Sequence, residues 1–274
     1  LIGQCPRALY EMLFGAVSGT LTEFAANPRW LGGIAAFTLV LHTWKQDLAR
    51  HVHLHALVPG GALSPDGDWI AAKRGFLFPI EALSSVFRGK FVAALKRARQ
   101  GGKLQQAGIT DQAWRDSLSA VHRHAWVVYA KHSLGGPAQV LDYLGRYTHR
   151  VAISNERILG MDADTVRLRV RDSAHANRRR TLSVPAQTFI ERFLLHVLPK
   201  GFKRIRHYGL LGPARKAVKL AQARAALSAP VPDPLVVESV EAFMHRIDRL
   251  DWMRCTHCGK GQFVPTAPIA PAPL

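Results

Sequence analysis

Apolar residues recur along this chain at two different spacings, which separate helices from strands. Between residues 7 and 26 they recur every three or four positions, which predicts an amphipathic helix that ends at Asn27-Pro28. Residues 35–44 and 52–59 are instead short and mostly apolar, so they predict two strands. The stretch 60–69 is rich in Gly, Asp and Pro, and it predicts a hairpin.

The rest of the chain mixes helical and strand-like patterns. Helical spacing predicts helices over 79–100, 110–121, 135–150, 186–197 and 213–227. Residues 125–130 predict a strand, and 165–184 predict a basic hairpin. Together these elements predict an α+β fold, in which helices pack on a small antiparallel sheet that carries the histidines described below, with helical extensions at both ends.

The 274 residues suit one large domain or two ordinary ones. We predict four segments: a helical N-terminal part over 1–34, a core over 35–160, a basic hairpin with helices over 161–228, and a C-terminal part over 229–274. The last part begins with a proline-rich linker, and its Pro/Ala-rich end after residue 264 predicts disorder.

The net charge of the chain says more about its binding partners than about its fold. The formal net charge is +18 and the hydrophobic content is 48%, which indicates a folded chain that binds a polyanion. Nucleic acid is the favoured partner; a ribosomal-type binder and a membrane-surface protein are the alternatives. The three cysteines are too few for a disulfide framework, and no apolar run is long enough to span a membrane. The sequence begins with neither a signal peptide nor a methionine, which suggests a fragment or a trimmed start.

Three histidines alternate with apolar residues on the second predicted strand, at positions 51, 53 and 55. Because side chains at i and i+2 of a strand share a face, the three imidazoles point one way while Val52 and Leu54 point into the core. Neutral imidazole binds first-row divalent metals, so the pattern favours a metal site over a solvated strand with incidental histidines.

A further ligand would come from the end of the preceding strand. His42, Gln46 and Asp47 lie there, and the sequence does not choose among them. We take Gln46 as the further ligand of the predicted site, beside the strand histidines His51, His53 and His55.

Two tyrosines lie four residues apart on the helix predicted over 139–150. Tyr143 and Tyr147 therefore share one helix face. A tyrosine hydroxyl can attack a phosphate when cations or a metal assist it, and Arg146 and Arg150 carry positive charge close by. The spacing by itself favours ordinary helix packing of two half-buried tyrosines.

The two motifs together resemble the HUH endonuclease superfamily, and most closely the two-tyrosine rolling-circle transposases of bacterial insertion sequences of the common-region type. The resemblance covers residues 7–262, and four blocks carry it: 51–61, 78–91, 143–154 and 193–209. Members of that family carry an N-terminal cysteine-rich zinc segment. Only Cys5 precedes the matching region here, so the resemblance implies a chain without that segment.

The resemblance implies a reaction as well. His53 and His55 would be the HUH pair, and Tyr143 and Tyr147 the nucleophiles. The enzyme would nick and rejoin single-stranded DNA at element ends through a 5′-phosphotyrosine, with Mg²⁺ or Mn²⁺ assisting. It would act at the nucleoid in the bacterial cytoplasm. The sequence contains no P-loop motif, so a host helicase would open the duplex.

Two other functions remain open. The chain could be an inactive remnant that binds element ends without cutting them, or a zinc-dependent hydrolase that uses the three histidines and a water nucleophile. Only the strand transferase predicts a covalent adduct between tyrosine and DNA.

Basic residues and a cysteine pair are the remaining candidate binding residues. The predicted DNA-binding residues are Arg88, Lys90, Arg146, Arg150, Arg167 and Arg169, with a solvated basic surface as the alternative. Cys255 and Cys258 supply two of the four ligands that a structural zinc needs. His257, His245 or a partner chain would have to complete that site, and the alternative is a pair of free thiols.

Overall fold

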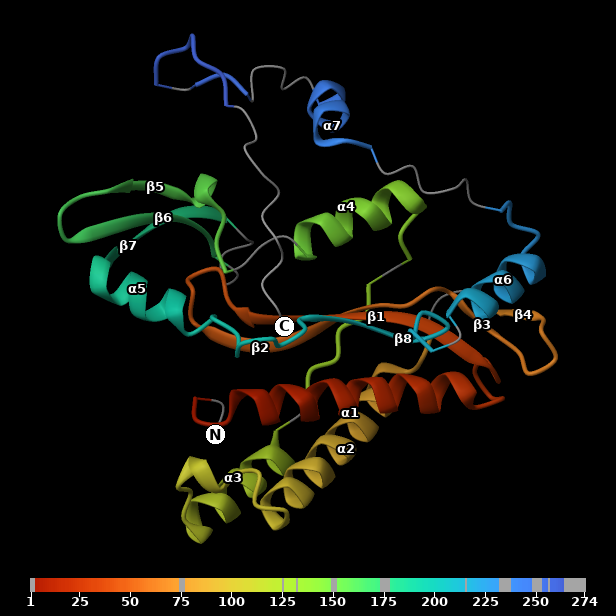
Figure 1. Cartoon of the computed structure of the whole chain (residues 1–274). Coiled ribbons are helices and arrows are strands. Elements are labelled where there is room, and N and C mark those ends of the chain that lie inside the picture. Colours follow the sequence, from red (N-terminus) through yellow and green to blue (C-terminus); the bar gives the residue numbers. More distant parts are fainter. Residues whose placement is uncertain are drawn as a thin grey trace. The chain divides into compact units, whose positions relative to one another are not determined.

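The computed structural model describes ten stretches of the chain: residues 3–73, 77–124, 126–131, 133–148, 152–172, 178–214, 216–231, 238–247, 253–255 and 257–263. These belong to two compact units, Leu1–Ala229 and Pro230–Leu274. The predicted α+β class is confirmed, since helices pack on two sheets whose strands are antiparallel (Figure 1). The finer division of the first unit into three segments stays a prediction.

A five-stranded sheet is the centre of the first unit. Its longest strand is β1 (Ile34–Trp44), which pairs antiparallel with β2 (Arg50–Leu57) and β8 (Ile205–Gly209). The short hairpin of β3 (Gly61–Leu63) and β4 (Trp69–Ala71) extends the sheet from the start of β1. Nine of the eleven residues of β1 are buried, so both faces of this strand are covered.

Two long helices cover one face of this sheet. They are α1 (Pro6–Ala26) and α2 (Ile80–Gln100), which lie on the same side of the sheet in Figure 1. Phe37, Leu39 and Leu41 of β1 point toward them and form the main core with Phe14 of α1. Since side chains alternate along a strand, the residues between these three point to the opposite face. That face carries His42.

A 3₁₀ turn and two further helices come between α2 and the second half of the chain. A 3₁₀ turn over Gln105–Ala107 and α3 (Asp111–Arg123) follow α2, and α4 spans Pro137–Thr148. Thr110 caps α3 by accepting a hydrogen bond from the Ala113 amide at 3.2 Å. In Figure 1, α4 lies on the opposite side of the five-stranded sheet from α1 and α2.

A second, three-stranded sheet follows α4. A 3₁₀ turn over Asn155–Arg157 leads into β5 (Ile158–Met161), β6 (Thr165–Asp172) and β7 (Arg178–Pro185), and α5 (Ala186–Leu194) packs on the apolar face. Leu168 lies at the centre of this second core and is fully buried. The first unit ends with α6 (Lys216–Ala226), and the second unit contains α7 (Val240–Arg246).

Most predicted elements are present within two or three residues of their expected ends. The strand predicted at 125–130 is wrong: the described residues 126–130 form no strand. There Trp126 packs against Phe87 and Phe91 of α2, with ring centroids 4.8 and 5.2 Å away, and its carbonyl accepts a hydrogen bond from Ser84. Residue 125 and the tail after residue 263 lie outside the described residues. None of the described helices has the length and apolar character needed to cross a membrane.

Candidate metal centre and tyrosine

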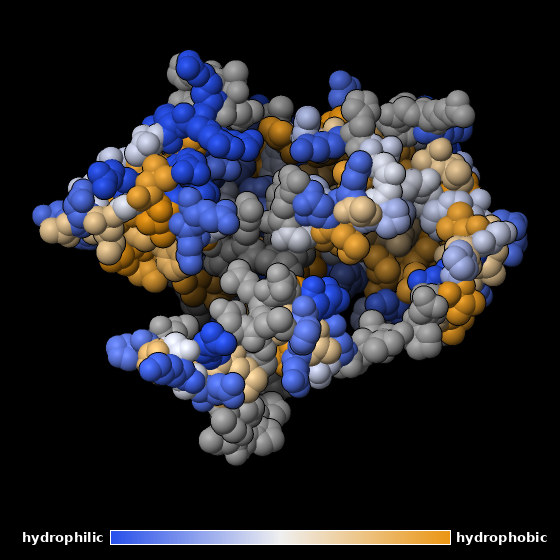
Figure 2. Space-filling view, turned by 90° about the horizontal axis from the view of Figure 1, so that it is seen from above, coloured by the Kyte–Doolittle hydropathy of each residue, from blue (hydrophilic) through white to orange (hydrophobic). Residues whose placement is uncertain are grey.

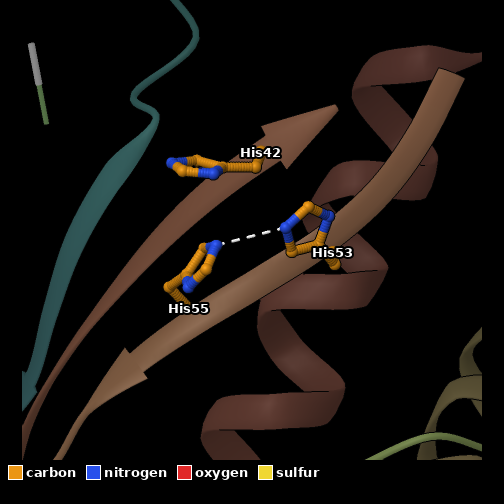
Figure 3. Close-up of side chains that lie close together, drawn as sticks. All are labelled: His42, His53 and His55. Carbon is orange, nitrogen blue, oxygen red and sulfur yellow. Dashed lines mark hydrogen bonds between the residues drawn. The ribbon is translucent and has the colours of Figure 1, made fainter. Parts of the chain in front are cut away.

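The pairing of β1 with β2 brings three histidines onto one face of the sheet. His42 of β1 lies directly opposite His53 of β2, and Val40 lies opposite His55. Side chains opposite each other in an antiparallel pair share a face, and so do positions two apart on one strand. His42, His53 and His55 therefore converge above the sheet (Figure 3).

The three rings are close enough to share one ion. One ring nitrogen from each lies within 4.8 Å of the other two, and the Nε2 atoms of His53 and His55 are 3.1 Å apart. Two imidazole nitrogens at about 2.1 Å from the same ion would be roughly 3.0 to 3.4 Å apart, for ligand angles between a right angle and the tetrahedral value. The spacing of this pair therefore fits a divalent metal.

Neighbouring groups fix the orientation of the rings. The Nδ1 atom of His53 lies 2.9 Å from the carbonyl oxygen of His51, to which it donates a hydrogen bond. His42 is buried and stacks on Trp44, with ring centroids 4.5 Å apart. A donor bond from one ring nitrogen to a carbonyl is the usual support of a metal-binding imidazole, because it leaves the other nitrogen bare.

Burial keeps two of these rings neutral. It lowers the pKa of His53, and it lowers the pKa of His55 to about 3, where the charges of His42, His53 and Lys131 act in the same direction. Only the neutral ring has a lone pair for a metal, so protons compete weakly with a cation at this cluster.

A tyrosine hydroxyl lies beside the cluster. The hydroxyl of Tyr143, on α4, is 3.1 Å from Nδ1 of His55, although the two residues are 88 positions apart. The opposite nitrogen of the same ring, Nε2, is the one that points to His53. One imidazole thus connects the candidate metal position to the tyrosine oxygen.

Other residues of the predicted site are placed differently. The His51 side chain is exposed and lies outside the group of three, with its ring centroid 4.8 Å from that of His53. Gln46 lies in the turn after β1, where its carbonyl accepts a hydrogen bond from Arg157. Asp47 also lies outside the group, and its carboxylate accepts a bond from the Ala49 amide. His42, of the three residues considered at the end of β1, is the one that joins the strand histidines.

Part of the tyrosine block lies outside the described residues. Tyr147 and Arg146 belong to α4, but their side chains are not described, and neither is Arg150. Sequence reasoning missed Lys131, which is exposed and whose charge acts on His55. No spacing or motif marks Lys131, since it reaches the cluster only through the fold.

The second sheet presents a basic face. Arg167, Arg169 and Arg171 alternate with buried residues along β6, so their side chains point away from the core. The register sets Arg179 of β7 opposite Arg171, and adds hydroxyl side chains at positions 181 and 183 on the same face. Seen from above, hydrophilic side chains gather over this sheet at the left of Figure 2.

The other predicted DNA-binding residues lie on α2. Lys90 forms an ion pair with Glu23 of α1 at 2.7 Å, so a carboxylate already neutralises its charge. Arg88 donates a weak bond of 3.4 Å to the His122 carbonyl. On the basic face of β6 and β7, Arg167 lies 3.8 Å from the carboxylate of Asp162, in the turn at the end of β5.

Comparison with known proteins gives the family. Residues 36–218, about two thirds of the chain, match the family model Y2_Tnp, described as "Putative transposase". The chain is 45% identical over 265 residues to the "Putative transposase y4qJ" of Sinorhizobium fredii, covering 93% of this chain and 67% of that protein. It is 27% identical over 278 residues to the transposase for insertion sequence element IS801 of Pseudomonas savastanoi pv. phaseolicola, covering 96% of this chain and 63% of that protein. No solved structure matches significantly. The matched region contains the whole of the histidine cluster, Tyr143 and the basic sheet, and the chain belongs to the Y2_Tnp family of transposases.

Proposed function

We propose that this chain is a metal-dependent DNA strand transferase of the HUH type, which cuts one strand and holds the cut end on a tyrosine. The observation that carries the proposal is the hydrogen-bond distance between Tyr143 and His55, within a cluster of three histidines. The similarity to an insertion-sequence transposase supports it. A rolling-circle mode, action at the nucleoid and help from a host helicase belong to the same proposal.

The hydrogen-bond pattern assigns protons to the cluster. Because Nδ1 of His53 donates to a carbonyl, its neutral ring has a bare Nε2, which accepts a bond from Nε2–H of His55. Nδ1 of His55 is then bare and accepts the proton of the Tyr143 hydroxyl. In this state the tyrosine hydroxyl donates its hydrogen bond to the His55 ring.

A bound cation changes that arrangement. If Nε2 of His55 were a metal ligand, the neutral ring would carry its proton on Nδ1 and would donate it to the tyrosine oxygen. This donor bond stabilises the negative charge on Tyr143. The metal would be Mg²⁺ or Mn²⁺, and three nitrogen ligands favour Mn²⁺ of the two. It would supply electrophilic assistance at the scissile phosphate.

The transfer chemistry is balanced without an outside reactant. The Tyr143 oxygen attacks the phosphorus, the bond from phosphorus to the 3′ oxygen breaks, and the 3′ oxygen leaves with a proton. The products are a 5′-phosphotyrosine and a free 3′-hydroxyl. In the joining step a 3′-hydroxyl attacks that phosphorus and the tyrosine oxygen leaves. Tyr147, one helical turn away on α4, would serve a second transfer.

We also propose that the basic face of β6 and β7 holds the DNA backbone. Alternate residues of a strand are roughly 6.8 Å apart, so Arg167, Arg169 and Arg171 form a row of guanidinium groups that can contact successive phosphates. Arg179 widens the row at one end. Such contacts position a strand without reading its sequence.

This basic face can be tested by salt dependence. Neutralising two phosphate contacts, Arg169→Gln with Arg171→Gln, should lower the slope of log K against log salt by about 1.4 for single-stranded DNA. The matched control is Arg178→Gln with Arg180→Gln, which removes the same charge from β7 on the opposite face. Equal slopes for the two variants would contradict a specific role of this face.

The main test is formation of a covalent adduct. Labelled single-stranded oligonucleotides that carry element ends are incubated with Mn²⁺ and analysed on a denaturing gel. The wild-type chain should give a shifted band, while the double variant Tyr143→Phe/Tyr147→Phe and the variant His55→Ala should give none. Tight binding without an adduct in the wild type would favour the inactive DNA-binding remnant. Cleavage that survives in the tyrosine variants would favour a hydrolase.

A further inference from the structure

A small turn in the second unit is built around two cysteines. The described residues 253–255 and 257–263 fold back on each other, with an antiparallel bridge between Arg254 and Gln262. The Cys255 amide donates to the Gly261 carbonyl at 2.7 Å, and the Phe263 amide donates to the Met253 carbonyl at 2.6 Å. These bonds join the two described segments of the turn.

A backbone amide contacts the sulfur atom of Cys258. The Gly261 amide donates to Sγ of Cys258 at 3.2 Å, and the Gly259 amide donates to the Cys255 carbonyl at 2.9 Å. Gly259 has a φ of +66°, in the left-handed region that favours glycine, so the tight turn after Cys258 depends on it. An amide that donates to sulfur stabilises a thiolate, and the thiolate is the metal-binding form of cysteine.

We infer that Cys255 and Cys258 are the thiolate half of a zinc site in the second unit. Two cysteines separated by two residues are a common half of a four-ligand zinc site, and thiolates favour zinc over Mg²⁺ and Mn²⁺. The site differs in ligand chemistry from the histidine cluster, so it holds a structural ion and takes no part in strand transfer.

A redox role fits the geometry less well. The reactive cysteine pairs of disulfide oxidoreductases have a lowered thiol pKa at a helix N-terminus. Here the residues that follow Cys258 form turns and a bridge, and no helix begins among the described residues 257–263. Neither cysteine forms a disulfide bond, and Cys258 is exposed.

The two remaining ligands lie elsewhere. Among the residues that the structure describes, no third histidine, cysteine or carboxylate joins the pair. A tetrahedral site therefore needs two further groups, which come either from other residues of the same chain or from the same turn of a second copy. The two sources differ in stoichiometry.

Metal content of the full-length chain tests the inference. The background is His53→Ala/His55→Ala, which disables the histidine cluster, and Cys255→Ser/Cys258→Ser is added to it. We expect the parent variant to retain about one zinc per chain, or about one per two chains in a dimer, and the serine variant to lose it. Replacement of zinc by Co²⁺ should give a near-ultraviolet charge-transfer band in the parent alone, since that band requires thiolate ligands.

Two outcomes would overturn the inference. One is equal zinc content in the parent and the serine variant. The other is the absence of a thiolate-to-cobalt band from a parent whose Cys255 and Cys258 react as free thiols. The His53→Ala/His55→Ala background cannot carry out strand transfer, but neither zinc readout depends on that activity. The zinc site and the proposed function are therefore tested independently.

Discussion

The position of His42 predicts that it contributes strongly to metal affinity, although the histidine pattern on β2 does not include it. In the structure, His42 joins His53 and His55, while the His51 side chain lies outside the group. Structural zinc sites with four ligands bind with about 10 to 16 kcal/mol, or roughly 2.5 to 4 kcal/mol per ligand. Mn²⁺ binds nitrogen ligands more weakly, so we expect a smaller loss, about 2 kcal/mol or roughly thirtyfold in Kd, when one of the three ligands is removed.

The variant His42→Phe tests this prediction most directly. Phenylalanine keeps a ring that can stack on Trp44 and fill the buried position, but it has no lone pair. The control is His51→Ala, which leaves the carbonyl that accepts the bond from Nδ1 of His53. Its affinity should change by less than about threefold, because only an exposed side chain is lost.

Mn²⁺ titration followed by electron paramagnetic resonance measures both variants directly, since thiolates bind Mn²⁺ poorly and the histidine cluster dominates the signal. Thermal unfolding of each variant checks that the fold is intact. Wild-type affinity in a folded His42→Phe chain would refute the three-histidine site. A large loss of Mn²⁺ affinity in His51→Ala would instead favour the prediction from the strand pattern, in which His51 is a ligand.

Three further predictions concern the fold around the site. Leu168→Ala, at a fully buried position of the second core, should cost about 2 to 5 kcal/mol of unfolding free energy in chemical denaturation; a cost under about 1 kcal/mol would contradict the packing described. Gly209→Ala should lower the free energy of unfolding by more than about 2 kcal/mol, because Gly209 has a φ of +62° and an added Cβ would lie 1.8 Å from a carbonyl oxygen of β1. The control Gly89→Ala should be neutral or stabilising, because there is open space around Gly89 in α2. Arg206 donates two hydrogen bonds of 2.6 Å to the Glu11 carboxylate and lowers the pKa of that carboxyl. The pair therefore stabilises the fold above the unfolded pKa of about 4.3, and this stabilisation is lost as the pH falls through the lower pKa of the folded state. Glu11→Gln should therefore reduce stability at pH 7 by at most about 1 kcal/mol and have no effect at the lowest pH, as measured by denaturation at both pH values; an equal effect at both would contradict the pairing.

The sequence predicts local features of the site well. Alternation along β2 suffices to put His53 and His55 on one face, because the side-chain period of a strand is fixed. Helical spacing likewise suffices to place Tyr143 on a helix. These features depend only on residues close together in the chain.

Features that depend on distant contacts could not be predicted. The choice of His42 over Gln46 and Asp47 depends on the register between β1 and β2, which places His42 opposite His53. The strand β8 pairs with β1 from more than 160 positions away, and no periodicity in its five residues marks it. The segment at 125–130 has the composition of a strand, but Trp126 packs on α2 and no partner strand is present among the described residues.

The central claim is that a tyrosine of α4 becomes covalently joined to DNA. The most direct measurement is mass spectrometry of the protein after reaction with a single-stranded end, digestion with a nuclease and a protease, and identification of the peptide that carries the nucleotide. We expect a 5′-phosphate linked to Tyr143 or, for the second transfer, to Tyr147, and no such peptide in His55→Ala. A nucleotide on a different residue, or a 3′-phosphate linkage, would contradict it.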